Sequence, residues 1–312
     1  MDNPIHVPVL LEEVVVWLRP RAQGCYLDCT VGLGGTAEQI LKASAPDGVL
    51  VGIDRDPHAI AHAHTRLQSY QSRVSLFCEN FQRVKSVMSL VNRERVDGIL
   101  FDLGVSSAQL ERPERGLSFQ QDGPLDMRMN PTHGQTAEDL VNTLSEMQLA
   151  NIIHTLGEER YARRIARAIV RVRRQSRLRT TMDLSRLIQE SVPRSYRSGR
   201  LHPATRTFQA FRMAVNDELG SLKTGLDEVL DVLAPEGRLC VISFHSLEDR
   251  LVKQTFRRLA HDTPDQWALL TKKPVSPSVE ERRANSRARS AKLRVIERKP
   301  GWGDAPAGRS HA

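Results

Sequence analysis

A glycine-rich turn between two short apolar strands constrains the fold of this chain more than any other feature. Residues 28–36 read DCTVGLGGT, and the apolar residues before them, Tyr26 and Leu27, indicate a strand. Helical periodicity begins at Thr36, and a second apolar strand ends in Asp54. In a βαβ unit, glycines let the backbone approach a ligand, and an acid ending the second strand can bind a ribose diol. The pattern predicts a nucleotide-type cofactor site in a doubly wound α/β sheet.

Asp28, directly before the glycines, bears on which cofactor fits. A dinucleotide places its pyrophosphate at the helix start and requires the spacing G-x-G-x-x-G, whereas Gly32, Gly34 and Gly35 read G-x-G-G. A carboxylate repels pyrophosphate and attracts an ammonium group, and S-adenosylmethionine carries both a ribose and an α-ammonium. We therefore expect S-adenosylmethionine rather than NAD. A purely structural glycine turn is the alternative.

The overall charge favours a polyanionic partner. The 312 residues carry a formal net charge of +8 and a sequence pI near 9.6, which is typical of many nucleic-acid-binding proteins but also of basic proteins that bind none. No basic start followed by an apolar core opens the chain, and no run of about eighteen apolar residues occurs. We expect no membrane association and a cytoplasmic location.

The cysteines and histidines predict no metal site. None of the four cysteines shows the paired C-x-x-C spacing of zinc or redox sites, and all lie in or beside apolar runs: Cys25, Cys29, Cys78 and Cys240. We expect buried thiols. The ten histidines are scattered, and three are expected on the surface of one helix: His58, His62 and His64.

The order of apolar runs predicts a sheet interrupted by a helical insertion. Further strands are expected at 74–78, 96–101 and 238–243, and the gap before the last strand is far longer than a crossover needs. The sequence thus predicts a first part of the sheet domain at 1–114 and a second at 203–299, with a helical domain at 115–202. Closing strands are expected at 267–272 and 293–298, a mobile loop at 280–289 and a disordered tail at 300–312.

Asp102 is the candidate catalytic residue. It follows the apolar run Ile99-Leu100-Phe101 and begins a polar loop, so it faces the crevice in which α/β sheets bind ligands. In a transferase acting on an amino group, its carboxylate can accept a hydrogen bond from that group or orient the cofactor. An acid that only caps the loop is the structural alternative.

One helix is predicted to carry a cationic face. The segment from Arg160 to Arg179 contains nine arginines and no acid, while apolar residues recur at helical spacing. A run of charges usually marks a solvated helix face. Because no acids balance these arginines, phosphate binding is an equally good explanation.

Many ordered motifs resemble one family, the bacterial 16S ribosomal RNA N4-cytosine methyltransferases. The resemblance covers nearly the whole chain and rests on the glycine turn and on nine further segments: 6–11 (HVPVLL), 52–57 (GIDRDP), 97–107 (DGILFDLGVSS), 115–119 (RGLSF), 122–129 (DGPLDMRM), 157–160 (GEER), 202–210 (HPATRTFQA), 243–250 (SFHSLEDR) and 287–290 (RARS). It implies a Rossmann-like methyltransferase domain interrupted by a helical substrate-recognition domain. It also implies methylation of a cytidine N4 in the decoding centre of 16S rRNA.

The resemblance further implies a set of cofactor contacts: Gly34, Gly35, Thr36, Asp54, Phe81, Asp102 and Gln109. Phe81 would stack near the adenine. Thr36 departs from the family, which usually has His after the two glycines. Its backbone N–H can still face the cofactor, but any contact made by a His side chain is lost. The 243–250 segment, at the end of the fifth strand, is expected to border the target base, with no firm role for any one residue.

Two other functions stay open at this stage. A nicotinamide-dependent oxidoreductase is disfavoured by Asp28, and a non-catalytic RNA-binding factor is disfavoured by the intact Gly34, Gly35, Asp54 and Asp102. The small ribosomal subunit is the substrate that the resemblance implies. The oligomeric state is open, with a homodimer among the alternatives.

Overall fold

The computed structural model describes residues 8–199 and 201–301, which divide into two compact units. The first unit combines Met1–Gly104 with Gly220–Ala312, and the second is Val105–Leu219. No helix within the described ranges is long and apolar enough to span a membrane. The tail expected at 300–312 lies outside these ranges except for Pro300 and Gly301.

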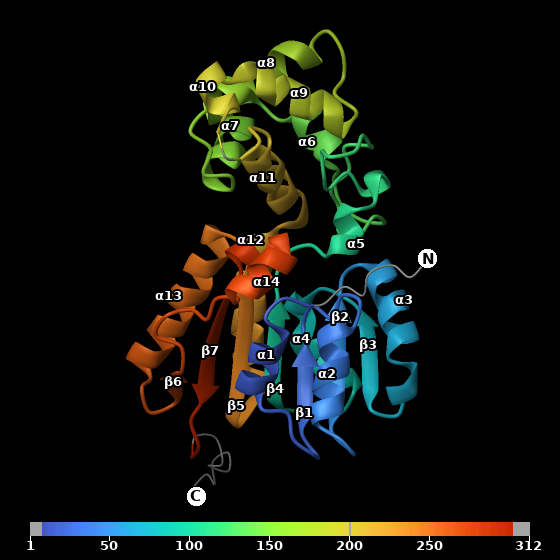
Figure 1. The fold of residues 1–312 in the computed structure, drawn as a ribbon, viewed down its shortest axis with the longest axis vertical. Helices are drawn as coiled ribbons and strands as arrows, with labels where there is room; N and C mark the ends of the chain where they lie inside the picture. Colours follow the sequence, from blue (N-terminus) through green and yellow to red (C-terminus); the bar gives the residue numbers. More distant parts are fainter. Residues whose placement is uncertain (1–7, 200, 302–312) are drawn as a thin grey trace, which may run out of the picture. The chain divides into compact units, whose positions relative to one another are not determined.

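A seven-stranded sheet in the order β3-β2-β1-β4-β5-β7-β6 forms the centre of the first unit (Figure 1). The strands that carry it are β1 (Cys25–Asp28), β2 (Val49–Asp54), β3 (Val74–Cys78), β4 (Val96–Asp102), β5 (Leu233–Ser243), β6 (Trp267–Leu269) and β7 (Lys292–Arg298). Strands β1 to β5 run parallel, whereas β7 is antiparallel to both β5 and β6. The doubly wound α/β sheet is confirmed, with two antiparallel strands added at one edge.

Helices cover both faces of this sheet because successive strand residues point to opposite sides. Tyr26 and Leu100 lie in a core with α1, α2 and α3, while Leu27 and Phe101 lie in a second core with α4, α12 and α13. The helices of this unit are α1 (Leu11–Leu18), α2 (Gly35–Ala43), α3 (Pro57–Arg66), η1 (Gln68–Tyr70), η2 (Phe81–Arg83), α4 (Val84–Leu90), α12 (Glu218–Val232), α13 (Ser246–Asp262), α14 (Val279–Ala284) and η4 (Ser286–Ser290). Helix α12 begins at the end of the second unit.

The prediction of a mobile loop at 280–289 was wrong, because α14 and η4 occupy this segment. Ser278 caps α14 by accepting the Glu281 N–H, and Glu281 Oε1 accepts the Leu10 N–H at 2.8 Å. Ala288 is fully buried. Capping and burial therefore order a segment whose composition alone is typical of a loop.

The expectation of four buried thiols also needs one correction. Cys25, Cys29 and Cys240 are buried, but Cys78 is exposed. Cys78 ends β3, the strand at one edge of the sheet, so fewer elements cover it. The predicted surface position of His58, His62 and His64 on α3 is confirmed.

The second unit is a helical bundle around its own apolar core. Its helices are α5 (Ser107–Leu110), η3 (Pro113–Arg115), α6 (Ala137–Thr143), α7 (Glu146–Thr155), α8 (Ala162–Arg173), α9 (Thr181–Ser191), α10 (Arg194–Arg197) and α11 (Thr205–Asn216). The unit is longer at both ends than the 115–202 expected from sequence. Val105 and Leu110 pack against its core, and so do Phe208 and Phe211 of α11. Packing rather than composition decides where the unit begins and ends.

Candidate functional site

Three carboxyl groups stand at the carboxyl ends of three adjacent strands. Asp28 ends β1, Asp54 ends β2 and Asp102 ends β4, and β1 lies between the other two. Burial is the main cause that raises the pKa of Asp28 to about 7, of Asp54 to about 6 and of Asp102 to about 8. Asp54 adds to the increase at Asp28, and Asp28 adds to that at Asp102, because like charges disfavour ionisation. This edge of the sheet is therefore complementary to a cation.

Backbone and hydroxyl groups hold the glycine turn against these acids. The Gly32 N–H donates to Asp54 Oδ2 at 2.9 Å, and the Asp56 N–H donates to Asp54 Oδ1 at 2.9 Å. The Asp102 N–H donates to Thr30 Oγ1 at 2.6 Å. Gly34 adopts φ 79° as the N-cap of α2, a conformation that favours glycine. The turn is thus fixed at the ends of β2 and β4.

Asp102 keeps one unsatisfied acceptor. Its Oδ1 is buried and has no hydrogen-bond partner among the described residues. A buried carboxylate oxygen without a donor is unfavourable, so a ligand that supplies one would stabilise this position. Sequence reasoning selected Asp102 but not Thr30, whose hydroxyl fixes the Asp102 backbone.

The remaining predicted contacts fall into both units. In the first unit, Gly35 and Thr36 form the buried first turn of α2, and Phe81 begins η2 with its ring edge-on to Phe101 at 5.3 Å. The Arg55 guanidinium lies 5.9 Å from the centre of the Phe81 ring. Gln109 belongs to α5 in the second unit.

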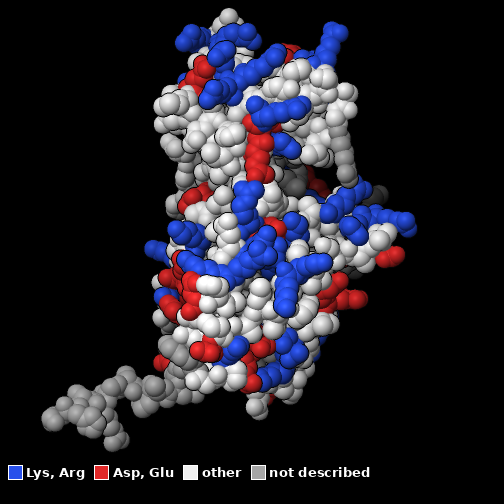
Figure 2. All heavy atoms as spheres, turned by 90° about the vertical axis from the view of Figure 1, so that its left-hand side faces the viewer, with Lys and Arg blue, Asp and Glu red and all other residues white. Residues whose placement is uncertain are grey.

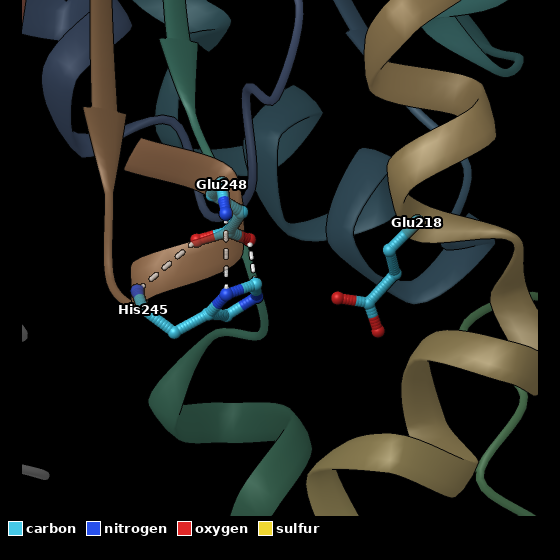
Figure 3. Close-up of side chains that lie close together, drawn as sticks. All are labelled: Glu218, His245 and Glu248. Carbon is cyan, nitrogen blue, oxygen red and sulfur yellow. Dashed lines mark hydrogen bonds and ion pairs between the residues drawn. The ribbon is translucent and has the colours of Figure 1, made fainter. Parts of the chain in front are cut away.

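His245 and Glu248 form a second polar group at this carboxyl edge, after β5 (Figure 3). His245 caps α13: its Nδ1 accepts the Glu248 N–H at 3.3 Å, and Glu248 Oε2 accepts the Phe244 N–H at 2.9 Å. His245 Nε2 lies 3.1 Å from Glu248 Oε1, but the geometry is outside that of a hydrogen bond, and this buried nitrogen has no hydrogen-bond partner among the described residues. The pair belongs to the 243–250 motif, which the sequence placed beside the target base without a firm role for either residue.

The second unit carries the predicted cationic helix. Ile165 and Ile169 of α8 are buried, whereas Arg163, Arg164 and Arg171 are exposed. Lys and Arg side chains gather in clusters on the face of the molecule drawn in Figure 2. The expected amphipathic pattern is confirmed over α8, whereas residues 174–179 lie outside the helix. A cavity of about 280 Å³ lies beside the helix, lined by Arg171, Arg177 and Arg186 among others.

A buried acid anchors the start of α8. Glu159 is fully buried and accepts the Tyr161 N–H at 2.8 Å and the Tyr196 hydroxyl at 2.6 Å. The Arg160 guanidinium lies 4.8 Å from the ring centres of both tyrosines. The 157–160 motif thus has a structural function, which is to fix the first turn of the cationic helix.

A doubly wound sheet with acids and a glycine turn at its carboxyl edge defines a Rossmann-like, cofactor-binding α/β protein. Comparison with known proteins narrows this class. The model of the MraW methylase family matches residues 3–299. The ribosomal RNA small subunit methyltransferase H of Citrifermentans bemidjiense is 48% identical over 311 residues, covering 96% of this chain and 100% of that protein. The protein of the same name from Halothermothrix orenii is 46% identical, covering 94% of this chain and 98% of that protein.

This chain belongs to the MraW methylase family. The family resemblance drawn from the motifs is confirmed, and so are the methyltransferase type of the sheet and the enzyme class. A nicotinamide-dependent oxidoreductase is no longer an alternative.

Proposed function

We propose that this protein transfers a methyl group from S-adenosylmethionine to the exocyclic N4 of a cytidine in the decoding centre of 16S rRNA. The observation that carries the proposal is the group of three acids at the ends of adjacent strands around the glycine turn. Relatives that match along their whole length are named for methylation of the small-subunit ribosomal RNA.

The residues at the carboxyl edge fit S-adenosylmethionine. Asp54 would hold the ribose: each of its oxygens accepts one backbone N–H, and a carboxylate oxygen has room for another donor. Phe81 would pack against the adenine, and the Gly34, Gly35 and Thr36 backbone would face the methionine part. A ligand with an ammonium and a sulfonium group would lower the raised pKa values of Asp28 and Asp102 and would be attracted by their carboxylates.

Asp102 is the proposed acceptor for the target amine. The bound cofactor supplies an electrophilic methyl group on a positively charged sulfur. N4 would bond to this carbon as the carbon–sulfur bond breaks with its electrons on sulfur, and the Asp102 carboxylate would accept the proton that N4 loses. The unsatisfied Asp102 Oδ1 can accept the N4 hydrogen bond and orient the lone pair of a weakly nucleophilic amine.

The cationic face of α8 supports an RNA substrate. Its exposed arginines can neutralise backbone phosphates, which provide most of the sequence-independent affinity for nucleic acid. The small ribosomal subunit is the proposed form of the substrate, and the cytoplasm is the proposed location.

Mass spectrometry of ribosomal RNA nucleosides, with and without this protein, tests the proposal directly. Incubation of small subunits or their RNA with the protein and S-adenosylmethionine should yield N4-methylcytidine at one position. Absence of methyl incorporation at every assembly state would overturn the proposed function. An Asp102→Asn variant that binds cofactor normally and keeps full turnover would exclude the acceptor role of Asp102 alone.

A further inference from the structure

The carboxyl edge of the sheet contains two buried polar atoms without hydrogen-bond partners among the described residues, Asp102 Oδ1 and His245 Nε2. Asp102 ends β4 and His245 follows β5, and these two strands pair with Asp102 opposite Ile242. Buried polar atoms are almost always hydrogen-bonded in folded proteins. Two exceptions at the end of one strand pair indicate a place for a polar ligand.

The two atoms have opposite hydrogen-bonding character. Because His245 Nδ1 accepts the Glu248 N–H, the ring proton of the neutral imidazole is on Nε2, which makes Nε2 a donor. Asp102 is an acceptor once a bound cation lowers its pKa and leaves it as a carboxylate. The matching ligand therefore presents a donor and an acceptor.

Glu248 links the two groups. Its Oε1 lies 3.1 Å from His245 Nε2, and its charge contributes to the raised pKa of Asp102. Phe244, between β5 and His245, borders the same loop, since a Cβ added to Gly104 would lie 3.8 Å from its ring. Gly104 itself has φ 94°, which keeps the loop after Asp102 close to the strand end without a side chain.

Cytosine carries the matching pair on neighbouring positions, an amino donor at N4 and a ring acceptor at N3. Uracil reverses both, with an acceptor at O4 and a donor at N3. A site with buried, directed polar groups discriminates strongly against a base that leaves them unpaired.

We propose that His245 contacts the substrate and donates a hydrogen bond from Nε2 to N3 of the target cytosine, while Asp102 accepts from the N4 amine. The inference rests on the proposed function and adds the residue that selects cytosine over uracil. His245 has two roles in this account: Nδ1 caps α13, and Nε2 reads the base.

The variant His245→Asn separates these roles. Asparagine is among the preferred N-cap residues, so its side-chain oxygen can accept the Glu248 N–H, but it is too short to place a donor where Nε2 lies. We expect an unchanged melting temperature, unchanged S-adenosylmethionine affinity by calorimetry, and a loss of about 10- to 100-fold in kcat/KM for RNA methylation. Methylation within about threefold of the wild type would overturn the inference.

A modified substrate tests the atom that His245 contacts. In 3-deazacytidine a C–H replaces N3, and the N4 amine is retained. Wild-type protein should methylate RNA with this base at the target position about 10- to 100-fold less efficiently, and His245→Asn should show little further loss on the same RNA. If the wild-type protein methylates the modified and the unmodified RNA equally well, the inference is overturned, whether or not the variant folds. If the variant and the modified base each lowered methylation efficiency and the two losses multiplied, His245 and N3 would act independently. That result would also overturn the inference.

These outcomes differ from a failure of the proposed function. If the wild-type protein transfers no methyl group to unmodified RNA, the proposed function itself fails before any variant is compared. If the wild type is active and His245→Asn equals it, only the role of His245 is wrong.

Discussion

Thr30 and Asp102 are joined by a 2.6 Å hydrogen bond in which the Thr30 hydroxyl oxygen accepts the Asp102 backbone N–H. The bond connects the glycine turn after β1 to the carboxyl end of β4. It fixes the backbone of the proposed amine acceptor relative to the proposed cofactor site.

Replacement of this hydroxyl should therefore affect binding and stability together. Thr30→Val keeps the shape but leaves the Asp102 N–H without an acceptor, which costs about 1–3 kcal/mol in a buried position. We expect a lower free energy of unfolding and roughly tenfold weaker S-adenosylmethionine binding by calorimetry. Thr30→Ser, which retains the acceptor, is the matched control and should resemble the wild type. Equal stability and equal S-adenosylmethionine affinity of the Val and Ser variants would contradict the proposed role of the Thr30 hydroxyl.

The pKa of Asp102 predicts a pH-dependent stability. Its folded-state value of about 8 lies above the value of about 3.9 for an unfolded chain, so the folded protein holds the extra proton between these limits. Stability should fall as the pH rises through this window. Asp102→Asn removes the charge and should raise the free energy of unfolding on the order of 1 kcal/mol at about pH 8, with little effect near pH 4.

Asp122 provides the opposite control. Backbone and side-chain hydrogen bonds, first that from the Met182 N–H, lower the pKa of this carboxyl group. Asp122→Asn should therefore not stabilise the protein at about pH 8. Denaturant titrations of both variants across pH would show whether the two substitutions diverge in this way.

Cofactor binding should release protons. Asp28, Asp54 and Asp102 have pKa values of about 7, about 6 and about 8, and a bound cation would lower all three. Affinity for S-adenosylmethionine should increase from about pH 5 to about pH 8, and the calorimetric enthalpy should depend on the ionisation enthalpy of the buffer. S-adenosylhomocysteine lacks the sulfonium charge, so it should release fewer protons. Equal, buffer-independent enthalpies for both ligands would argue against this site.

The arginines of α8 should determine RNA affinity and its salt dependence. A triple variant, Arg163→Gln, Arg164→Gln and Arg171→Gln, removes three exposed charges. We expect weaker binding to 16S rRNA and a slope of log K against log salt that is about 2 units shallower, given about 0.7 per phosphate contact on single strands. Cofactor affinity should not change. Lys42→Gln, Arg93→Gln and Lys273→Gln together remove three exposed charges outside α8 and are the control for net charge. An equal loss of RNA affinity in this control would indicate unspecific electrostatic attraction.

Thr36 should contribute through its backbone alone. It is the second residue of α2, after Gly34 as N-cap, where proline is tolerated because the N–H has no partner within the helix. Thr36→Pro should weaken S-adenosylmethionine binding about tenfold, whereas Thr36→Val should leave it within about twofold. If Thr36→Val instead binds S-adenosylmethionine weakly, the Thr36 side chain makes the contact.

Several elements were predictable because their signals are local. Asp28, Asp54 and Asp102 each end a short apolar strand, and parallel strands place their carboxyl ends at one edge of a sheet. The apolar stripe and arginine face of α8 follow from helical periodicity. The strand expected at 74–78 has the bounds of β3, since its apolar run ends in polar residues on both sides.

Other features depend on packing and could not be inferred from local pattern. Residues 279–290 are polar and basic, yet α14 and η4 form because Ser278 caps the helix and Glu281 bonds to Leu10 from the other end of the chain. The second unit extends to Leu219 because α11 buries Phe208 and Phe211 in its core.

The amino-acid sequence by itself determined the order of strands and helices, the acids at the strand ends, the cationic helix and the family, because each of these depends on residue type and spacing along the chain. Only the tertiary structure decided that Thr30 holds Asp102, that burial raises the pKa values of the three acids, and that His245 Nε2 lacks a hydrogen-bond partner among the described residues. Burial and proximity between residues far apart in sequence set hydrogen bonds and pKa values, and both arise only when the chain is packed.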